Sequence, residues 1–166
     1  MIGARIIHTK LMTVENDGHY PGSLINGGRL LDYFGDVGTE LMIRATGSGS
    51  MFRAYKEVQF LAPVHIGDFM EYHAWLEKKG RTSYEVHFEA WKTITRTDDY
   101  KISHQYGHGV TGEPDLKGYE GSILLDPPLL CGTAIGIMVV PEEEQMPAPD
   151  PRFRALNEGG TEEAKS

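Results

Sequence analysis

The sequence predicts an α+β fold, in which a curved antiparallel β-sheet wraps around one long central helix. Apolar residues recur at helical spacing over residues 26–43. After this stretch, the runs 51–63, 68–80 and 81–95 alternate apolar and polar residues with a period of two. A helical period in one stretch and a strand period in the runs that follow it indicate a single helix packed on a sheet.

The predicted helix begins after the turn-rich segment HYPGSLINGG, where Ser23 or Asn26 is expected to supply a capping side chain. The segment TGSGS at 46–50 ends it. Gly35 and Gly38 lie in its interior, where each glycine costs about 1 kcal/mol relative to alanine. Close approach to another backbone or to a ligand would explain that cost. The apolar side chains expected on one face are those of Leu30, Phe34, Val37 and Leu41.

The strands are predicted from alternation and from the turns that separate them. Residues 1–14 read as a first strand, and the turns PVHIGD and KKGRTS divide the next three runs into an antiparallel meander. The run at 129–141 is predicted to be another central strand. Such a sheet leaves an open edge, and one helix covers one face, so a homodimer or a larger assembly is expected to bury the remainder.

The length of 166 residues indicates one domain, which we place at 1–141. Within it, 93–128 is predicted to be an insertion or long connection because it is rich in glycine and lacks a clear period. The acidic segment 142–166 is predicted to be a disordered, solvated tail.

Composition excludes several classes of function. The net charge of −8 argues against nucleic acid or an anionic membrane as partner. No apolar run is long enough to span a bilayer, so a cytoplasmic location is expected. The single cysteine, Cys131, is expected to be buried and inert. His104 and His108 have a spacing compatible with a metal ion, but no third ligand is evident, so no metal is predicted.

Three carboxylates, Asp32, Asp36 and Glu40, recur every four residues along the predicted helix. Such a row most often forms a solvated face and costs only a few tenths of a kcal/mol for each like-charged pair. Asp32 fits this interpretation best. If the sheet encloses the helix, a solvated face does not explain the carboxylates of Asp36 and Glu40, and a functional role becomes the better explanation for them.

The turn and helix GSLINGGRLLDYFGDVG, followed by VQFLAPVHIGDFMEYHAWLEKKGRTSYEVHFEAW, resemble the hotdog fold of acyl-CoA thioesterases and dehydratases. More narrowly, HYPGSLINGGR, GDVGTELM, APVHIGDFMEYHAW and DPPLLCGTAIG are similar to the hotdog ammonia lyases that act on β-aminoacyl-CoA thioesters, β-alanyl-CoA or 3-aminobutyryl-CoA. The resemblance covers roughly residues 1–95 and 126–140.

The resemblance implies a carbon–nitrogen lyase that forms an enoyl-CoA and ammonia reversibly, in amino-acid fermentation. It implies no cofactor apart from the CoA carried by the substrate, and a homo-oligomer that is a dimer or a dimer-based hexamer. The alternative is hydrolysis of an acyl-CoA thioester on the same fold. Arg53, Lys56, Lys78, Lys79 and Arg81 are available for the CoA phosphates.

The lyase reaction requires a base for the α-proton and donors for the enolate oxygen. Asp36 or Glu40 would be the base, with Asp36 slightly favoured, and both acids would hold the cationic β-ammonium group. Free N–H groups at a helix start suit the enolate oxygen. The residues expected to bind the thioester oxygen or other parts of the substrate are Asn26, Gly27, Gly28 and His19.

Overall fold

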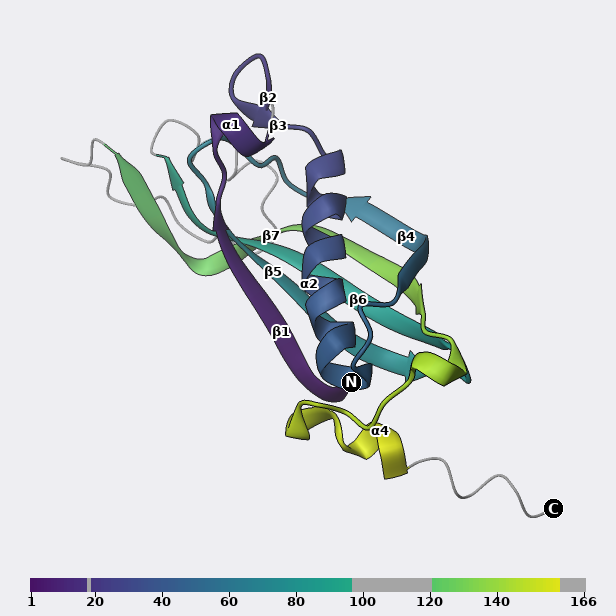
Figure 1. Cartoon of the computed structure of the whole chain (residues 1–166). Coiled ribbons are helices and arrows are strands. Elements are labelled where there is room, and N and C mark those ends of the chain that lie inside the picture. Colours follow the sequence, from purple (N-terminus) through teal and green to yellow (C-terminus); the bar gives the residue numbers. More distant parts are fainter. Residues whose placement is uncertain (18, 97–120, 159–166) are drawn as a thin grey trace.

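The computed structural model describes residues 1–17, 19–96 and 121–158. Its main sheet has five antiparallel strands in the order β1-β5-β6-β7-β4, and α2 lies across one face of it (Figure 1). The helix is α2 (Gly28–Thr46), and the strands are β1 (Ile2–Leu11), β4 (Met51–Phe60), β5 (Phe69–Lys79), β6 (Ser83–Arg96) and β7 (Ser122–Val139). This agrees with the predicted single helix on an antiparallel sheet.

Helix α2 buries the face that its sequence period predicts. Phe34, Val37 and Leu41 are at most 1% exposed and pack against the sheet. The helix ends at Gly47, whose φ of 78° is the left-handed conformation that glycine adopts without strain. At the other end Gly27 is the N-cap residue, and the side-chain oxygen of Asn26 accepts a hydrogen bond of 2.8 Å from the N–H of Gly28. Of the two side chains predicted to cap the helix, that of Asn26 therefore bonds at the helix start, from the position before the N-cap residue.

Strands β5 and β6 alternate as predicted, because a strand buries every second side chain when one face packs on a helix. Tyr72 and Phe88 are fully buried on the helix side. Phe34 on the helix stacks on Phe88, with ring centroids 5.1 Å apart. The opposite face carries the partly exposed polar and aromatic side chains, which include Glu71, His73, Trp75, Glu85, His87 and Glu89.

The predicted meander is wrong in one respect. Strand β4 pairs with β7 and not with β5, so residues 61–68 do not form a hairpin turn. They connect β4, at one edge of the sheet, to β5, beside the other edge. Alternation defines each strand but carries no information about its neighbour, which explains the error.

The run predicted as a central strand lies between β6 and β4 in β7, which confirms its placement. However, β7 begins at Ser122, earlier than the predicted 129. Pro127 and Pro128 interrupt the sequence signal, and the strand accommodates them beside a register shift between Lys92 and Ile94 of β6. Of the predicted connection 93–128, residues 97–120 lie outside the described part of the chain.

A short hairpin precedes the helix and connects it to the β4–β5 crossover. Helix α1 (Val14–Asp17) leads into β2 (His19–Tyr20) and β3 (Leu24–Ile25), which pair with each other. The N–H of Ile25 donates to the carbonyl of Val64 (2.8 Å), and the N–H of Ile66 donates to that of Ser23 (2.9 Å). The hairpin and residues 61–68 therefore meet beside the start of α2.

The acidic segment was predicted to be a disordered tail from residue 142, and this is wrong for residues 142–158. They form η1 (Glu142–Glu144), η2 (Pro151–Phe153) and α4 (Ala155–Glu158), of which η2 and α4 lie against β1 (Figure 1). Phe153 is fully buried and Leu156 is 7% exposed. The prediction failed because it rested on the acidic composition of the segment, whereas a few apolar side chains such as Phe153 and Leu156 pack against the domain. Residues 159–166 lie outside the described part of the chain.

The two helix glycines have different surroundings, which leads to a prediction. A Cβ at Gly38 would lie 3.0 Å from the Phe88 ring and 3.2 Å from the Met138 sulfur, both buried, whereas one at Gly35 would have no atom within 4 Å. Gly38→Ala is therefore expected to lower the free energy of unfolding by about 1–3 kcal/mol. Gly35→Ala should leave it unchanged or raise it by up to about 1 kcal/mol. Denaturant unfolding of both variants measures the contrast, and equal losses would contradict it.

Candidate active site

A cavity of about 790 Å³ opens at the start of α2. Three segments line it: the β2–β3 hairpin, the beginning of the helix and the chain that leaves β4. The lining is mainly apolar, as is usual for a ligand site. The residues that line it are Tyr20, Pro21, Gly22, Leu24, Ile25, Asn26, Gly27, Gly28, Leu30, Phe60, Leu61, Ala62, Pro63, Val64 and His65.

The backbone N–H groups at the helix start differ in whether they are already hydrogen-bonded. The Gly28 N–H is occupied by the side chain of Asn26, and Arg29 and Leu30 donate to the carbonyls of Asn26 and Gly27. Among the described residues, the N–H of Gly27 has no hydrogen-bond partner. A Cβ at Gly27 would lie 3.1 Å from the Phe60 ring, so the missing side chain also leaves room there. Gly27 is thus the best placed of the predicted donors.

The structure does not bring the predicted acids to this cavity within one chain. Asp36 lies nine residues after Gly27, about 13 Å along the axis at roughly 1.5 Å per residue. Its side chain is exposed and makes no ion pair or hydrogen bond within the described residues. Asp36 is therefore a carboxylate available to a ligand or to a second subunit.

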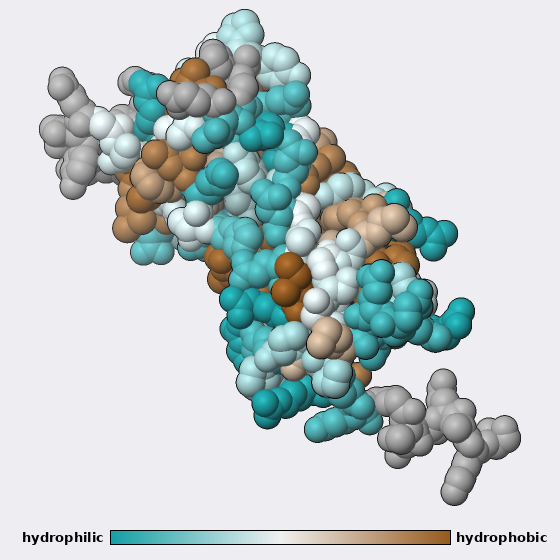
Figure 2. Space-filling view, viewed as in Figure 1, coloured by the Kyte–Doolittle hydropathy of each residue, from teal (hydrophilic) through white to brown (hydrophobic). Residues whose placement is uncertain are grey.

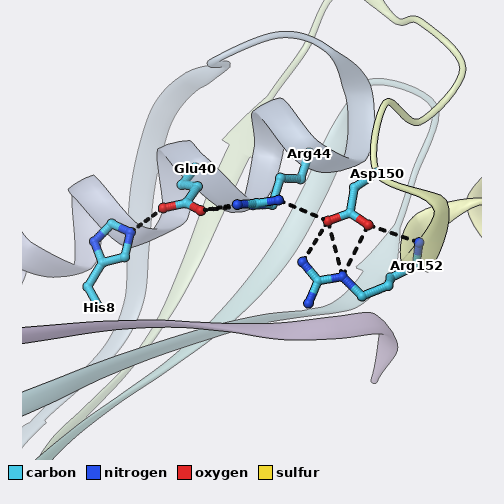
Figure 3. A network of polar contacts seen from close by, with 5 residues as sticks. All are labelled: His8, Glu40, Arg44, Asp150 and Arg152. Carbon is cyan, nitrogen blue, oxygen red and sulfur yellow. Dashed lines mark hydrogen bonds and ion pairs between the residues drawn. The ribbon is translucent and has the colours of Figure 1, made fainter.

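Glu40, in contrast, belongs to a chain of polar contacts that runs from β1 to the C-terminal segment (Figure 3). Its two oxygens are hydrogen-bonded to His8 and to Arg44, the latter at 2.8 Å. The guanidinium group of Arg44 also lies 3.2 Å from a carboxylate oxygen of Asp150. The same oxygen lies 2.6 Å from the guanidinium group of Arg152. The hydrogen bonds from His8 and then from Arg44 lower the pKa of Glu40. A carboxylate held in this way is less suited than Asp36 to accept a proton.

The lowered pKa of Glu40 predicts a pH-dependent contribution to stability. A carboxylate whose pKa falls on folding stabilises the protein above its ordinary value of 4.5 and loses that contribution as the pH falls. Glu40→Gln should therefore lower the free energy of unfolding at about pH 6 and have a smaller effect at about pH 3. Denaturant unfolding at both pH values measures the difference.

Glu57→Gln is the matched control for this prediction. Glu57 is an exposed carboxylate on β4 with no ion pair or hydrogen bond among the described residues. The same loss of stability at both pH values in Glu40→Gln would contradict the role of the ionised pair.

Asp32 occupies the outer face of α2, as its spacing predicts. It is 60% exposed and pairs with Arg29 at 2.9 Å. Figure 2 shows hydrophilic side chains along much of the face that α2 presents. The sheet therefore covers one side of the helix. Asp32 and Asp36 face outward in a single chain, whereas Glu40 is half-buried beside His8 of β1. An enclosed position is therefore wrong for Asp36 in a single chain, and the exposure expected for Asp32 is confirmed.

The remaining candidates are a cysteine, three histidines and five basic residues. Burial raises the pKa of Cys131 to about 12, and its thiol is fully buried. The backbone of His19 pairs with that of Ile25 in the hairpin beside the cavity. His104 and His108 lie outside the described residues.

None of the five basic residues considered for the CoA phosphates lines the cavity. Four of them bind other groups in the chain, and these are Lys56, Lys78, Lys79 and Arg81.

Sequence reasoning missed the contribution of residues 60–65 to the cavity. Phe60 is 57% exposed although it is a large aromatic residue, and His65 is buried beside the hairpin. From the sequence alone, the apolar run FLAPV indicates only the end of a strand. An apolar run that ends at a proline between two strands is a signal that it leaves the sheet.

The described residues contain no group of three or more His, Cys, Asp or Glu side chains that could hold a metal ion. In the same part of the chain, no helix combines the length and hydropathy needed to cross a membrane.

Comparison with known proteins agrees with this fold. Residues 22–97 match the family model of the thioesterase superfamily. The chain is 35% identical to 3-aminobutyryl-CoA ammonia lyase of Acetoanaerobium sticklandii over 136 residues, which are 82% of this chain and 94% of the relative. The structure of β-alanyl-CoA:ammonia lyase from Clostridium propionicum matches with a TM-score of 0.78 at 37% identity, over 93% of this chain and 97% of that one.

More distant structures share the fold alone. A hexameric thioesterase from Yersinia pestis matches with a TM-score of 0.57 at 16% identity, over 86% of this chain and 92% of that one. The helix on an antiparallel sheet, with a cavity at the helix start, thus defines a protein of the hotdog thioesterase superfamily. Within this superfamily, the chain belongs to the family of CoA ammonia lyases that includes the 3-aminobutyryl-CoA enzyme. The predicted resemblance is confirmed, and the lyase is favoured over the thioesterase.

Proposed function

We propose that this protein eliminates ammonia from a small β-aminoacyl-CoA, of the 3-aminobutyryl-CoA or β-alanyl-CoA type, to give the enoyl-CoA, and that it catalyses the reverse addition. Membership of the CoA ammonia lyase family carries this proposal. The carboxylate of Asp36, which is exposed and has no partner among the described residues, supports it, because a substrate with a β-ammonium group is a cation.

Asp36 acts as the base. It takes the proton from the α-carbon of the thioester, and the electron pair of that C–H bond forms the double bond between the α- and β-carbons as the C–N bond breaks. The ammonia that leaves then receives the proton from Asp36 and departs as ammonium. Charge on the thioester oxygen in the transition state is stabilised by the N–H of Gly27.

The acyl-CoA binds in the cavity at the helix start, with its thioester at Gly27. Asn26 fixes this turn through its bond to the Gly28 N–H, and His19 belongs to the neighbouring hairpin. No cofactor takes part beyond the CoA of the substrate.

The active form is a homo-oligomer built from dimers. Gly27 and Asp36 are about 13 Å apart on one helix, whereas the thioester carbon and the α-carbon of the substrate are bonded neighbours. The donor and the base that act on one substrate therefore come from two subunits. The open space beside Gly35, one residue from Asp36, is consistent with a substrate or a second subunit at that position.

A pair of assays on the purified protein tests the reaction. Loss of the enoyl-thioester absorbance of crotonyl-CoA or acryloyl-CoA is followed with and without ammonium, and free CoA thiol is measured in parallel. Ammonium-dependent loss without thiol release is the expected result. Release of thiol that does not depend on ammonium would overturn the proposal and indicate a thioesterase.

A further inference from the structure

A buried ion pair lies beneath the cavity, on the β6 side. The ammonium group of Lys92 lies 2.9 Å from the carboxylate of Asp68, and both side chains are completely buried. Removal of two charges from water is costly, and well-packed apolar residues often replace such a pair without loss of stability. The pair therefore adds little net stability, and its directional bonds fix one particular geometry.

That geometry is the conformation of the turn at residues 63–68. Lys92 donates to the carbonyl oxygen of Pro63 at 2.7 Å, at the beginning of the turn. Asp68, at its end, accepts from the N–H of His65 at 2.8 Å and from the hydroxyl of Thr95 at 2.7 Å. Two residues of β6 thus hold both ends of the 63–68 turn.

The 63–68 turn is hydrogen-bonded to the hairpin that forms one wall of the cavity. Its Val64 carbonyl accepts from Ile25, and its Ile66 N–H donates to Ser23, so the β2–β3 hairpin rests on it through two backbone hydrogen bonds. The Met12 N–H donates to the Asp68 carbonyl at 2.9 Å, which fixes the end of β1 to the same turn. Pro63, Val64 and His65 also line the cavity directly.

We propose that Lys92 is a positioning residue for the acyl-CoA site: with Asp68, it fixes the 63–68 turn and through it the hairpin wall that receives the substrate. This inference rests on the proposed function for the identity of the ligand. Lys92 does not touch the reacting atoms in this proposal, so its loss weakens binding of the CoA thioester more than it slows the chemical step.

The test compares three variants with the wild type, all as the full chain. Lys92→Met removes the cation. The double variant Lys92→Met with Asp68→Asn leaves no unpaired charge and keeps an oxygen for the His65 N–H. Phe153→Ala creates a cavity in η2, directly before α4, and controls for destabilisation alone. Helix α4 lies at the end of the molecule opposite the β2–β3 hairpin (Figure 1). Denaturant unfolding, KM and kcat with crotonyl-CoA and ammonium, and the Kd of CoA by calorimetry are measured for each.

In Lys92→Met, KM and the Kd of CoA are expected to rise by about tenfold or more, with a smaller change in kcat. The double variant should regain stability but not affinity, because no cation reaches the Pro63 carbonyl. Wild-type affinity in the double variant, or an equal rise in KM in Phe153→Ala, would overturn the proposal. If Lys92→Met does not fold, the double variant still decides. Binding of CoA by a wild type without lyase activity would refute the proposed function alone, and absence of CoA binding would refute both.

Discussion

Asp36→Asn is expected to lower the kcat of ammonia elimination by about 10²- to 10⁴-fold, the usual contribution of a positioned general base. The amide is nearly the same size as the carboxylate but cannot accept the α-proton. Because Asp36 is exposed and has no partner among the described residues, the substitution should leave the free energy of unfolding almost unchanged. Steady-state kinetics with crotonyl-CoA and ammonium, together with denaturant unfolding, measure both quantities.

Asp32→Asn is the matched control, because the same chemical change is made one turn earlier on the exposed side of the same helix. Its kcat should stay within about threefold of the wild-type value, since Asp32 bonds to Arg29. Glu40→Gln separates the two candidate bases. Full activity in Asp36→Asn with a large loss in Glu40→Gln would reverse the assignment, and full activity in both would refute an acid of this helix as the base.

The elements of the fold could be predicted from local sequence, but their neighbours could not. The helical period of Leu30, Phe34, Val37 and Leu41 and the alternation in β5 and β6 describe burial, and burial is what the structure shows at these positions. Pairing of β4 with β7 joins residues about eighty positions apart, and no local pattern specifies such a contact.

The candidate site was predictable to the extent that its chemistry depends on the helix start. The glycine-rich turn before α2 indicated a backbone donor, and the structure places Gly27 in the wall of a cavity. The sequence could not show that Glu40 is held by hydrogen bonds while Asp36 has no partner among the described residues, because both acids lie at the same spacing along the helix. The difference arises from His8 on β1 and Arg44 one turn further on, and the position of His8 depends on the sheet. The ion pair of Lys92 and Asp68 could not be predicted from the sequence either. The two residues are 24 positions apart, and only the folded sheet brings the ammonium group to 2.9 Å from the carboxylate.

Phe153→Ala is expected to lower the free energy of unfolding by about 3–5 kcal/mol, the usual range for truncation of a buried phenylalanine. The ring is fully buried although it belongs to a segment dominated by proline and charged residues. It fills the space above Gly3, where a Cβ would lie 2.4 Å from the ring. Denaturant unfolding under conditions of fixed protein concentration measures the loss.

Arg154→Ala is the control, because the neighbouring side chain is exposed and makes no ion pair or hydrogen bond within the described residues. It should change the free energy of unfolding by no more than about 0.5 kcal/mol. A loss of less than about 1 kcal/mol in Phe153→Ala would mean that residues 142–158 contribute little to the domain. The expected large loss would instead make residues 142–158 an integral part of the folded domain, because the buried Phe153 ring fixes this segment against β1.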